Sequence, residues 1–277
     1  MAAADTLFTG SIPEIYDRFL VPLIFEPYAR DLAERLAKAK PKGVLETAAG
    51  TGVLTRAMAA VLPANARIVA TDLNQPMLDR AAAREPHDGR IVWQQANALA
   101  LPFADQTFDV VACQFGVMFF PDKVQGYREA YRVLKPGGCI FFNVWDQISE
   151  NEFADVVTDA LATQFPVNPP RFMANVPHGY HEVGTIREEL TEAGFVAISV
   201  ETLDCKSSAS SPRVPAIAYC QGTPLRNEIE AHDASRLEGA TQAAADALAR
   251  RFGDGAVEAR IRAHVISAVR PVNSANN

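Results

Sequence analysis

The chain has 277 residues, 48% of them hydrophobic and 21% charged, which is the composition of a globular protein able to bury a sizeable core. A net charge of -7 with scattered basic residues argues against nucleic acid as a partner, because such proteins concentrate Lys and Arg against phosphate. The four cysteines have no CxxC spacing, the N-terminus lacks the features of a signal peptide, and no apolar run reaches the length of a membrane span. We therefore expect a cytoplasmic protein without membrane insertion.

Strands and helices alternate regularly after a helical N-terminal element, which we place at residues 1–40. The pattern predicts helices and strands over the following ranges: strands at 43–46, 67–72, 91–95, 108–113 and 139–144, and helices at 52–61, 75–84 and 121–133. Strands that are apolar on both faces and separated by helices indicate a parallel sheet covered on both sides. The predicted fold class is a doubly wound α/β protein.

The pattern beyond residue 145 is less regular. Residues 149–181 hold four prolines together with aromatic residues, which is typical of a lid or a binding loop. The remaining elements are predicted as follows: a helix at 185–193, a strand at 195–203, a loop at 207–212, helices at 215–221, 225–230 and 237–252, and a last strand at 261–269. We expect one domain, with a core formed by 41–204 and 257–277 and a helical insertion or lid at 205–256.

The strongest functional signal is the turn between the first strand and the helix after it, Glu46-Thr47-Ala48-Ala49-Gly50-Thr51-Gly52. Small residues let the backbone approach a ligand closely, and the N-terminus of a helix offers free N–H groups and positive potential. A single turn of this kind is a weak signal, because nicotinamide enzymes and ordinary tight turns use it too.

Polar residues follow the next strands in an informative order. Asp72 ends the second strand and could accept hydrogen bonds from ribose hydroxyls, or instead begin the next helix as a cap. Asn97 follows the third strand and could read an adenine edge, or serve only the turn. Gln114 ends the fourth strand, and a sharp turn at 134–138 precedes the fifth. All these positions fall on the carboxyl edge of one sheet, where open α/β sheets bind ligands.

These motifs together resemble the class I S-adenosylmethionine-dependent methyltransferases, in particular the small-molecule group that includes ubiquinone/menaquinone-type C-methyltransferases. The resemblance covers roughly residues 16–145 and implies a mostly parallel seven-stranded, Rossmann-like sheet. It implies S-adenosylmethionine as cofactor and S-adenosylhomocysteine as product. The aromatic residues of the predicted lid and the lack of a basic patch indicate a small, fairly apolar molecule as methyl acceptor. The sequence leaves a homodimer open.

The resemblance also implies a role for each matching residue. The methionine part of the cofactor would be lined by Glu46, Ala48, Gly50 and Gly52, and the Gln114 backbone would face its amino group. Asp72 would hold the ribose. Tyr16 would close over the cofactor. The residues that would contact the adenine are Leu73, Met77, Asn97 and Ala98. The family usually has Asp, Gly and Asp where this chain has Glu46, Ala48 and Asn97.

Two other functions compete with methyl transfer. A nicotinamide-dependent oxidoreductase needs a third glycine where Thr55 stands, and it has no use for the turn at 134–138. A non-catalytic homologue that binds the adenosyl cofactor without turnover is the second alternative.

A general base would be needed only if the acceptor holds a proton at neutral pH. The candidates are Tyr16, His178 and His181. A lid or substrate-pocket role and an ordinary capped loop fit His178, Tyr180 and Arg171 equally. Although His178 and His181 form an HxxH pair, no further ligands lie at metal-binding spacing, so no metal is expected. Aromatic and Met side chains at 115–120 would either pack in the core or line an apolar acceptor pocket.

Overall fold

The computed structural model describes residues 10–85 and 88–272. In this part of the chain seven strands form one sheet in the order β3-β2-β1-β4-β5-β7-β6. Their bounds are β1 Gly43–Glu46, β2 Arg67–Asp72, β3 Ile91–Gln95, β4 Phe108–Gln114, β5 Leu134–Trp145, β6 Val196–Ala209 and β7 Val257–Val269. The seven-stranded doubly wound sheet expected from the sequence is confirmed.

The strand order reverses next to β1, which lies between β2 and β4. All pairs from β3 to β5 are parallel, and Glu46 at the end of β1 is in register with Ala70 on one side and Ala112 on the other. The chain moves outward in one direction through β2 and β3 and then returns to pair β4 on the other side of β1. Such a reversal opens a crevice at the carboxyl ends of the strands, which is where this architecture binds ligands.

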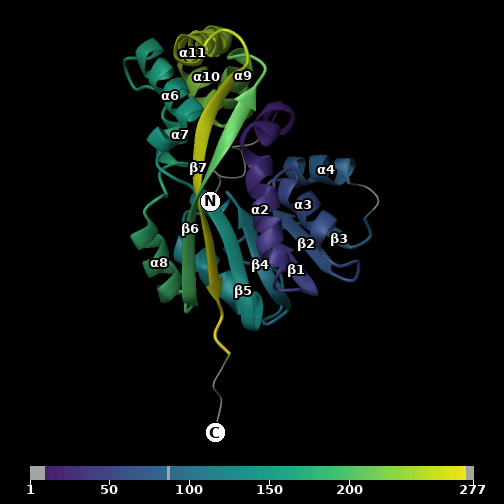
Figure 1. Ribbon diagram of the computed structural model, residues 1–277. Helices are drawn as coiled ribbons and strands as arrows, with labels where there is room; N and C mark the ends of the chain where they lie inside the picture. Colours follow the sequence, from purple (N-terminus) through teal and green to yellow (C-terminus); the bar gives the residue numbers. More distant parts are fainter. Residues whose placement is uncertain (1–9, 86–87, 273–277) are drawn as a thin grey trace. The chain divides into compact units, whose positions relative to one another are not determined.

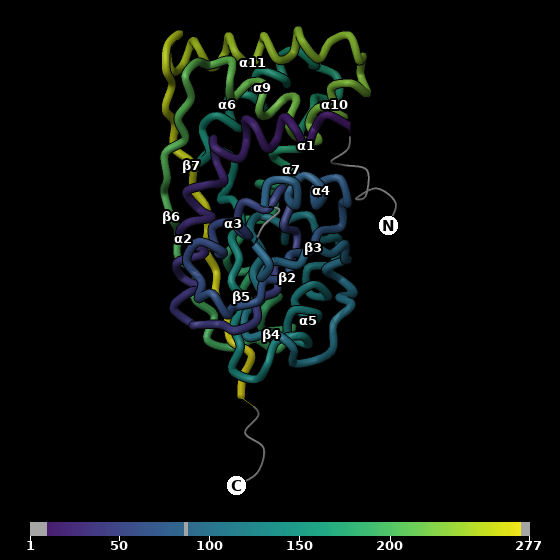
Figure 2. Tube along the Cα trace, turned by 90° about the vertical axis from the view of Figure 1, so that its right-hand side faces the viewer, coloured from purple at the N-terminus to yellow at the C-terminus, as the bar shows by residue number. Residues whose placement is uncertain are grey.

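The chain separates into two compact units, and one of them holds β1–β4 and most of β5. This sheet unit comprises residues 28–144, 181–202 and 264–277. Figures 1 and 2 show α2 and α3 on one face of its sheet and α5 on the opposite face. Its helices are α2 Glu26–Ala37, α3 Val53–Val61, α4 Gln75–Arg84, the short η2 Val117–Phe119, α5 Lys123–Val133 and α8 Val183–Glu192. The apolar positions of β1 and β4 are buried between these layers, as a parallel sheet requires.

The second unit is mostly helical and comprises residues 1–27, 145–180 and 203–263. We call it the helical unit. Its elements are α1 Ile12–Ile15, the π-helix η1 Tyr16–Phe25, η3 Ile148–Glu150, α6 Glu152–Gln164, α7 Phe172–Asn175, α9 Arg213–Gly222, α10 Leu225–His232, η4 Ala234–Arg236 and α11 Leu237–Phe252. Helix α9 packs against α11, η1, α1 and α10, so it forms the centre of this unit. The proposed division into cap, core and insertion stays a prediction.

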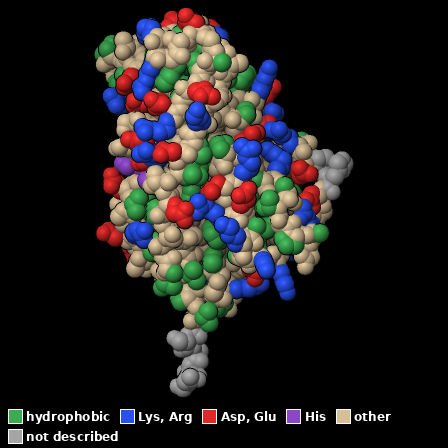
Figure 3. Space-filling view, viewed as in Figure 1, with side chains coloured by type: hydrophobic (Ala, Val, Ile, Leu, Met, Phe, Trp, Pro, Cys, Tyr) green, Lys and Arg blue, Asp and Glu red, His purple; other side chains and the backbone are tan. Residues whose placement is uncertain are grey.

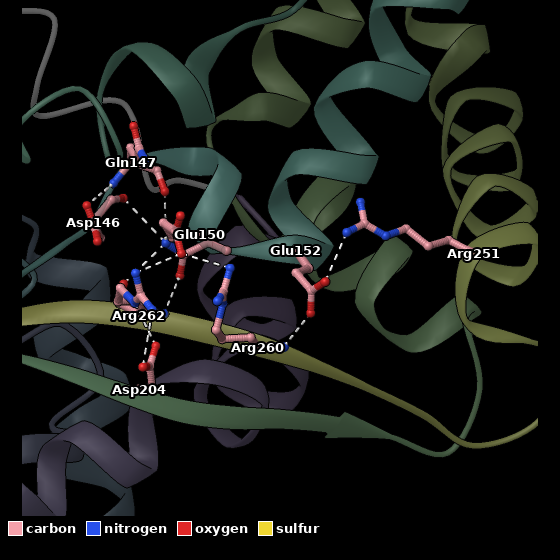
Figure 4. Close-up of polar contacts among 9 residues, drawn as sticks. Asp146, Gln147, Glu150, Glu152, Asp204, Arg251, Arg260 and Arg262 are labelled. Carbon is pink, nitrogen blue, oxygen red and sulfur yellow. Dashed lines mark hydrogen bonds and ion pairs between the residues drawn. The ribbon is translucent and has the colours of Figure 1, made fainter.

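An ion-pair network joins η3 to the adjoining parts of β6 and β7 inside the helical unit (Figure 4). Glu150 lies 2.8 Å from Arg260 and 2.9 Å from Arg262, which also contacts Asp204 at 2.7 Å. Asn151 adds two hydrogen bonds to the backbone of Arg262, one from the Arg262 N–H at 3.0 Å and one to the Arg262 carbonyl at 3.2 Å. The segment after β5 is thereby fastened to β7.

Three sequence expectations are corrected by the structure. The stretch at 149–181 is more regular than expected, because α6 occupies 13 of its residues, buries Phe153, Val157 and Leu161, and is followed by the four-residue α7. The loop expected at 207–212 begins later, since β6 continues to Ala209 and the buried Ser207 hydroxyl donates to the Leu23 carbonyl at 2.8 Å. β5 begins at Leu134 rather than 139, and the register shift opposite β4 accommodates the glycine turn.

Charged side chains of both signs are interspersed on the face drawn in Figure 3. Ion pairs join such groups in the described chain, and Arg35 with Asp31 at 2.7 Å is an example. Among residues 10–85 and 88–272, no helix has the length and apolar character needed to cross a bilayer.

Candidate cofactor site

The turn after β1 has the backbone that a closely approaching ligand requires. Ala48, Gly50 and Gly52 all have positive φ, at 54°, 55° and 78°. Gly52 is also the N-cap of α3, and a Cβ added there would lie 2.6 Å from the Trp93 ring. Glycine at this position is therefore required by both conformation and space. The turn presents the N-terminus of α3 at the carboxyl edge of the sheet, as the sequence predicts.

Glu46 is almost fully buried at the end of β1, with 1% of its surface exposed. The Thr55 hydroxyl donates to its carboxylate at 2.5 Å, and the Thr71 hydroxyl donates to its backbone carbonyl at 2.9 Å. Burial raises the pKa of Glu46 from 4.5 to about 8; the Thr55 hydrogen bond and Arg56 oppose the shift, whereas the charge of Asp72 adds to it. A cationic group placed beside this carboxyl would favour its ionised form.

Asp72 connects the end of β2 to the glycine turn. One carboxylate oxygen accepts the Gly50 N–H at 2.8 Å, and the other accepts the Asn74 N–H at 2.8 Å. Burial raises the pKa of Asp72, although these backbone hydrogen bonds oppose the shift. The second oxygen also accepts the Asn74 side-chain amide at 3.5 Å, whereas the first can accept another hydrogen bond, so the geometry is compatible with ribose binding in addition to this structural role.

The end of β3 shows the turn chemistry that competes with adenine recognition. The Asn97 side-chain oxygen accepts the Leu99 N–H at 2.9 Å, and the Asn97 backbone carbonyl accepts the Ala100 N–H at 3.0 Å. Ala98 lies inside this turn. Gln95 donates from its side chain to the Leu73 carbonyl at 2.8 Å, which holds the segment after β2 against the end of β3. Adenine contacts by Leu73, Asn97 and Ala98 stay predictions.

The end of β4 packs tightly against the glycine turn. Gln114 is buried and in register with Asn143 of β5, and the next residue, Phe115, has a positive φ of 51°. A Cβ added to Gly116 would collide with the Ala48 side chain and lie 2.7 Å from the Cys113 sulfur. The loop after β4 and the turn after β1 are therefore in contact through Gly116 and Ala48.

The structure thus brings together at one sheet edge most residues for which a cofactor role was inferred. The turn, Asp72, Met77 and Gln114 all belong to the sheet unit, and a Cβ added to Gly50 would lie 3.8 Å from the Met77 methyl group. Tyr16 belongs to the helical unit, so its closure over the cofactor stays a prediction. Sequence reasoning missed Thr55 and Thr71, because only the fold shows which hydroxyl reaches Glu46.

Two buried polar groups at this edge are available for hydrogen bonds to a bound small molecule. The Thr51 hydroxyl, inside the turn, and the Asn143 side-chain amide, beside Gln114, have no hydrogen-bond partner within residues 10–85 and 88–272. Both residues are at most 1% exposed. Buried polar groups are normally paired, so these two are candidates for contacts with a bound cofactor. The residues present therefore fit a polar adenosyl cofactor with an amino-acid end.

The two histidines of the HxxH pair lie in different units and have different surroundings. His178 is 4% exposed, and its Nδ1 lies 2.8 Å from the Asp146 carbonyl. His181 lies 3.1 Å from the Glu182 carboxylate, with 28% of its side chain exposed. In the described ranges, no group of three or more His, Cys, Asp and Glu side chains is arranged to hold a metal ion.

The fold is that of a doubly wound α/β protein with a candidate cofactor edge at its topological switch point, and comparisons with known proteins agree with this fold class. A family model described as a methyltransferase domain matches residues 45–142. A ubiquinone/menaquinone biosynthesis C-methyltransferase of Klebsiella pneumoniae is 41% identical over 180 residues, which is 58% of this chain and 68% of that protein. A demethylmenaquinone methyltransferase of Chlorobaculum parvum is 38% identical over 127 residues, 44% of this chain and 51% of that protein, so this match spans about half of the relative's length.

A solved structure adds agreement in fold. The Haemonchus contortus phosphoethanolamine N-methyltransferase 2, in complex with S-adenosyl-L-methionine, has a TM-score of 0.60 at 18% identity, covering 98% of this chain and 60% of that one. The chain belongs to the class I S-adenosylmethionine-dependent methyltransferases of the ubiquinone/menaquinone type.

Proposed function

We propose that this protein transfers a methyl group from S-adenosylmethionine to a small, fairly apolar acceptor by direct in-line displacement. The observation that carries the proposal is the construction of the sheet edge, where Asp72 accepts the Gly50 N–H and Gly116 contacts Ala48. These contacts bring the ends of β1, β2 and β4 into one site. Family membership supports the same reaction.

The proposed acceptor class is a hydroxylated aromatic ring in the reduced quinone state. The relatives from Klebsiella and Chlorobaculum have names that refer to ubiquinone, menaquinone and demethylmenaquinone. A reduced ring is required on chemical grounds, because its hydroxyl groups make the adjacent ring carbon nucleophilic and an oxidised quinone carbon is electron-poor. Phe115 and Met118 are buried, whereas Phe119 and Phe120 are partly exposed. We therefore propose that Phe119 and Phe120 make the apolar contact to the acceptor.

When bound, the sulfonium cofactor supplies a reactive methyl group, so the protein has mainly to position the two reactants. In this proposal Glu46 and the turn at 47–52 hold the amino-acid end of the cofactor. Asp72 holds the ribose through the carboxylate oxygen that also accepts the Gly50 N–H. Thr51 and Asn143 contribute the buried hydroxyl and amide for which the protein offers no partner in the described chain.

Calorimetry with S-adenosylmethionine and S-adenosylhomocysteine tests the cofactor, and release of S-adenosylhomocysteine with dithionite-reduced demethylmenaquinone tests turnover. We expect Asp72→Ala to weaken cofactor binding at least tenfold and Asp79→Ala to leave it unchanged, because Asp79 is exposed on α4 and contacts Gln75. Absence of binding at millimolar cofactor contradicts the proposal. Binding without turnover on a panel of phenolic, quinol and amine acceptors favours a non-catalytic homologue, and NADH titration tests the nicotinamide alternative.

A further inference from the structure

The residue that follows β4 has a backbone conformation that its residue type rarely adopts. Phe115 is buried and has a φ of 51°, in the left-handed region that favours glycine. Ala48, in the turn after β1, also has a left-handed backbone, and Gly116 packs against it. Strained residues of this kind persist only where their surroundings hold them, and they cluster at ligand sites. The conformation of Phe115 therefore needs support from the rest of the sheet unit.

Asn143 of β5 gives part of this support. The Phe115 N–H donates to the Asn143 backbone carbonyl at 3.1 Å and to the Asn143 side-chain oxygen at 3.1 Å. The carbonyl is the ordinary acceptor between parallel strands, whereas the side-chain oxygen is an additional one. Because Asn143 is 0% exposed, bulk water does not compete for this oxygen. The first residue of the loop after β4 is thereby fastened to β5 by two acceptors.

The Phe115 ring is held by a different element. Tyr28 belongs to α2, is 0% exposed, and meets the Phe115 ring edge-on, with the centroids 5.4 Å apart and an angle of 87° between the ring planes. This edge-to-face arrangement is favourable for two aromatic rings. The backbone and the ring of Phe115 are thus fixed from β5 and α2, and Tyr28, Phe115 and Asn143 all lie in the sheet unit.

We infer that Asn143 is a positioning residue for cofactor binding, a role that rests on the proposed function. It acts through Phe115: its side-chain oxygen stabilises the left-handed backbone, and this backbone keeps the loop after β4 packed against the glycine turn. Gln114 and Gly116, on either side of Phe115, are held in place with it. The cofactor then binds an edge that is already ordered, so its binding energy is not used to order the loop. The Asn143 amide nitrogen, which the proposed function assigns to the cofactor, has a separate role.

The first test measures the loop in the absence of cofactor, by amide hydrogen exchange of residues 115–119. Asn143→Leu has a similar shape without the side-chain oxygen, and its backbone carbonyl still accepts the Phe115 N–H, so the variant should fold. We expect exchange at least about tenfold faster in Asn143→Leu and within about threefold of the wild type in Asn143→Asp, which keeps an oxygen acceptor. Thr107→Val is the control, because it removes a hydrogen bond to the Ala104 carbonyl just before β4 and should leave this exchange unchanged.

The second test is a double-mutant cycle on S-adenosylmethionine affinity, measured by calorimetry. Asn143→Leu should weaken binding at least about tenfold in the wild type, and by a factor at least about threefold smaller in Phe115→Gly, because glycine adopts the left-handed backbone without support. A direct contact of the Asn143 amide alone would cost the same in both backgrounds.

Two results overturn the inference. One is wild-type exchange of residues 115–119 in Asn143→Leu, and the other is an equal loss of affinity in the two backgrounds. If Phe115→Gly does not fold, the exchange of Asn143→Leu against Asn143→Asp decides, and equal exchange in these two variants overturns the inference. If the wild type itself does not bind S-adenosylmethionine, the proposed function fails, whereas the exchange measurement still shows whether Asn143 holds the loop.

Discussion

Glu46 has surroundings that differ strongly from those of an ordinary exposed carboxyl group. It is buried, receives one hydroxyl hydrogen bond from Thr55, and lies close enough to the second buried carboxyl, Asp72, to sense its charge. Burial penalises the charged form, so the cofactor-free protein retains a proton that the unfolded chain would lose. The cationic amino group of the proposed cofactor would offset that penalty.

The raised pKa of Glu46 predicts how stability changes with pH when no cofactor is present. Below pH 4.5 the Glu46 carboxyl is protonated in both the folded and the unfolded chain. Between pH 4.5 and about 8 only the folded chain keeps this proton. The contribution of Glu46 to stability is therefore lost as the pH rises through that window. Each pH unit within the window changes the free energy of unfolding by about 1.4 kcal/mol from this group. Between about pH 5.5 and pH 7.5 the free energy of unfolding, measured with urea, should decrease less for Glu46→Gln than for the wild type. Equal decreases would contradict the assignment.

Gly116 is predicted to be essential for the contact between the two loops at the cofactor edge. An added methyl group would collide with Ala48 and lie 2.7 Å from the Cys113 sulfur, so Gly116→Ala should lower the free energy of unfolding by about 1–3 kcal/mol. It should also weaken S-adenosylmethionine binding, because the turn after β1 must move. Gly184→Ala is the control: this glycine is exposed at the start of α8, and nothing lies within 4 Å of an added Cβ. Denaturant unfolding and calorimetry on both variants measure the two effects.

At the scale of elements, the connection after β5 depends on one side chain. Asn151 pairs with the backbone of Arg262 in the manner of a neighbouring strand residue, and it also reaches the Asp146 carbonyl that fixes His178. The ion pair of Arg262 with Asp204 lies at the surface, where the side chain of Asp204 is 56% exposed, and its partner in the second pair, Glu150, is 21% exposed. The hydrogen bonds of the buried amide should therefore contribute more to stability than the visible charge network.

This difference is measurable with two substitutions. Asn151→Ala leaves the Arg262 N–H without its side-chain acceptor, so it should lower the free energy of unfolding by about 1–3 kcal/mol. Arg262→Gln removes only partly exposed ion pairs and should cost about 0–1 kcal/mol. Urea denaturation of both variants compares them directly. A larger loss for Arg262→Gln would show that the network, and not the amide, holds the segment after β5.

At the scale of the whole molecule, a ligand that binds only the folded protein raises its stability by mass action. S-adenosylhomocysteine at one hundred times its Kd should stabilise the chain by about 2.7 kcal/mol, and the melting temperature should rise by roughly 5–10 °C. Asp72→Ala should show little of this rise at the same concentration, because its carboxylate holds the turn. Differential scanning fluorimetry provides the measurement, with NADH as the comparison ligand. An equal rise with NADH would contradict the assigned cofactor.

The sequence by itself determined the sheet and indicated S-adenosylmethionine as the cofactor, and its assignment of cofactor-binding residues stays a prediction. Apolar strands separated by helices can only be buried as a parallel sheet with covered faces, and the turn at 46–52 needs small residues wherever the chain places it. Asp72 could be predicted because a residue at the end of a neighbouring parallel strand must reach the same edge. These signals are local, so periodicity and residue type were sufficient to reveal them.

Contacts between distant segments were decided only by the tertiary structure. Thr55 reaches Glu46, Asn151 pairs with Arg262 across 111 positions, and Ser207 stays within β6 because a carbonyl at Leu23 accepts its hydroxyl. The same applies to His178, since its Nδ1 forms a hydrogen bond with a carbonyl 32 residues away. Hydrogen bonds of this kind leave no periodic pattern in the sequence, because their partners are brought together only by packing of the whole chain.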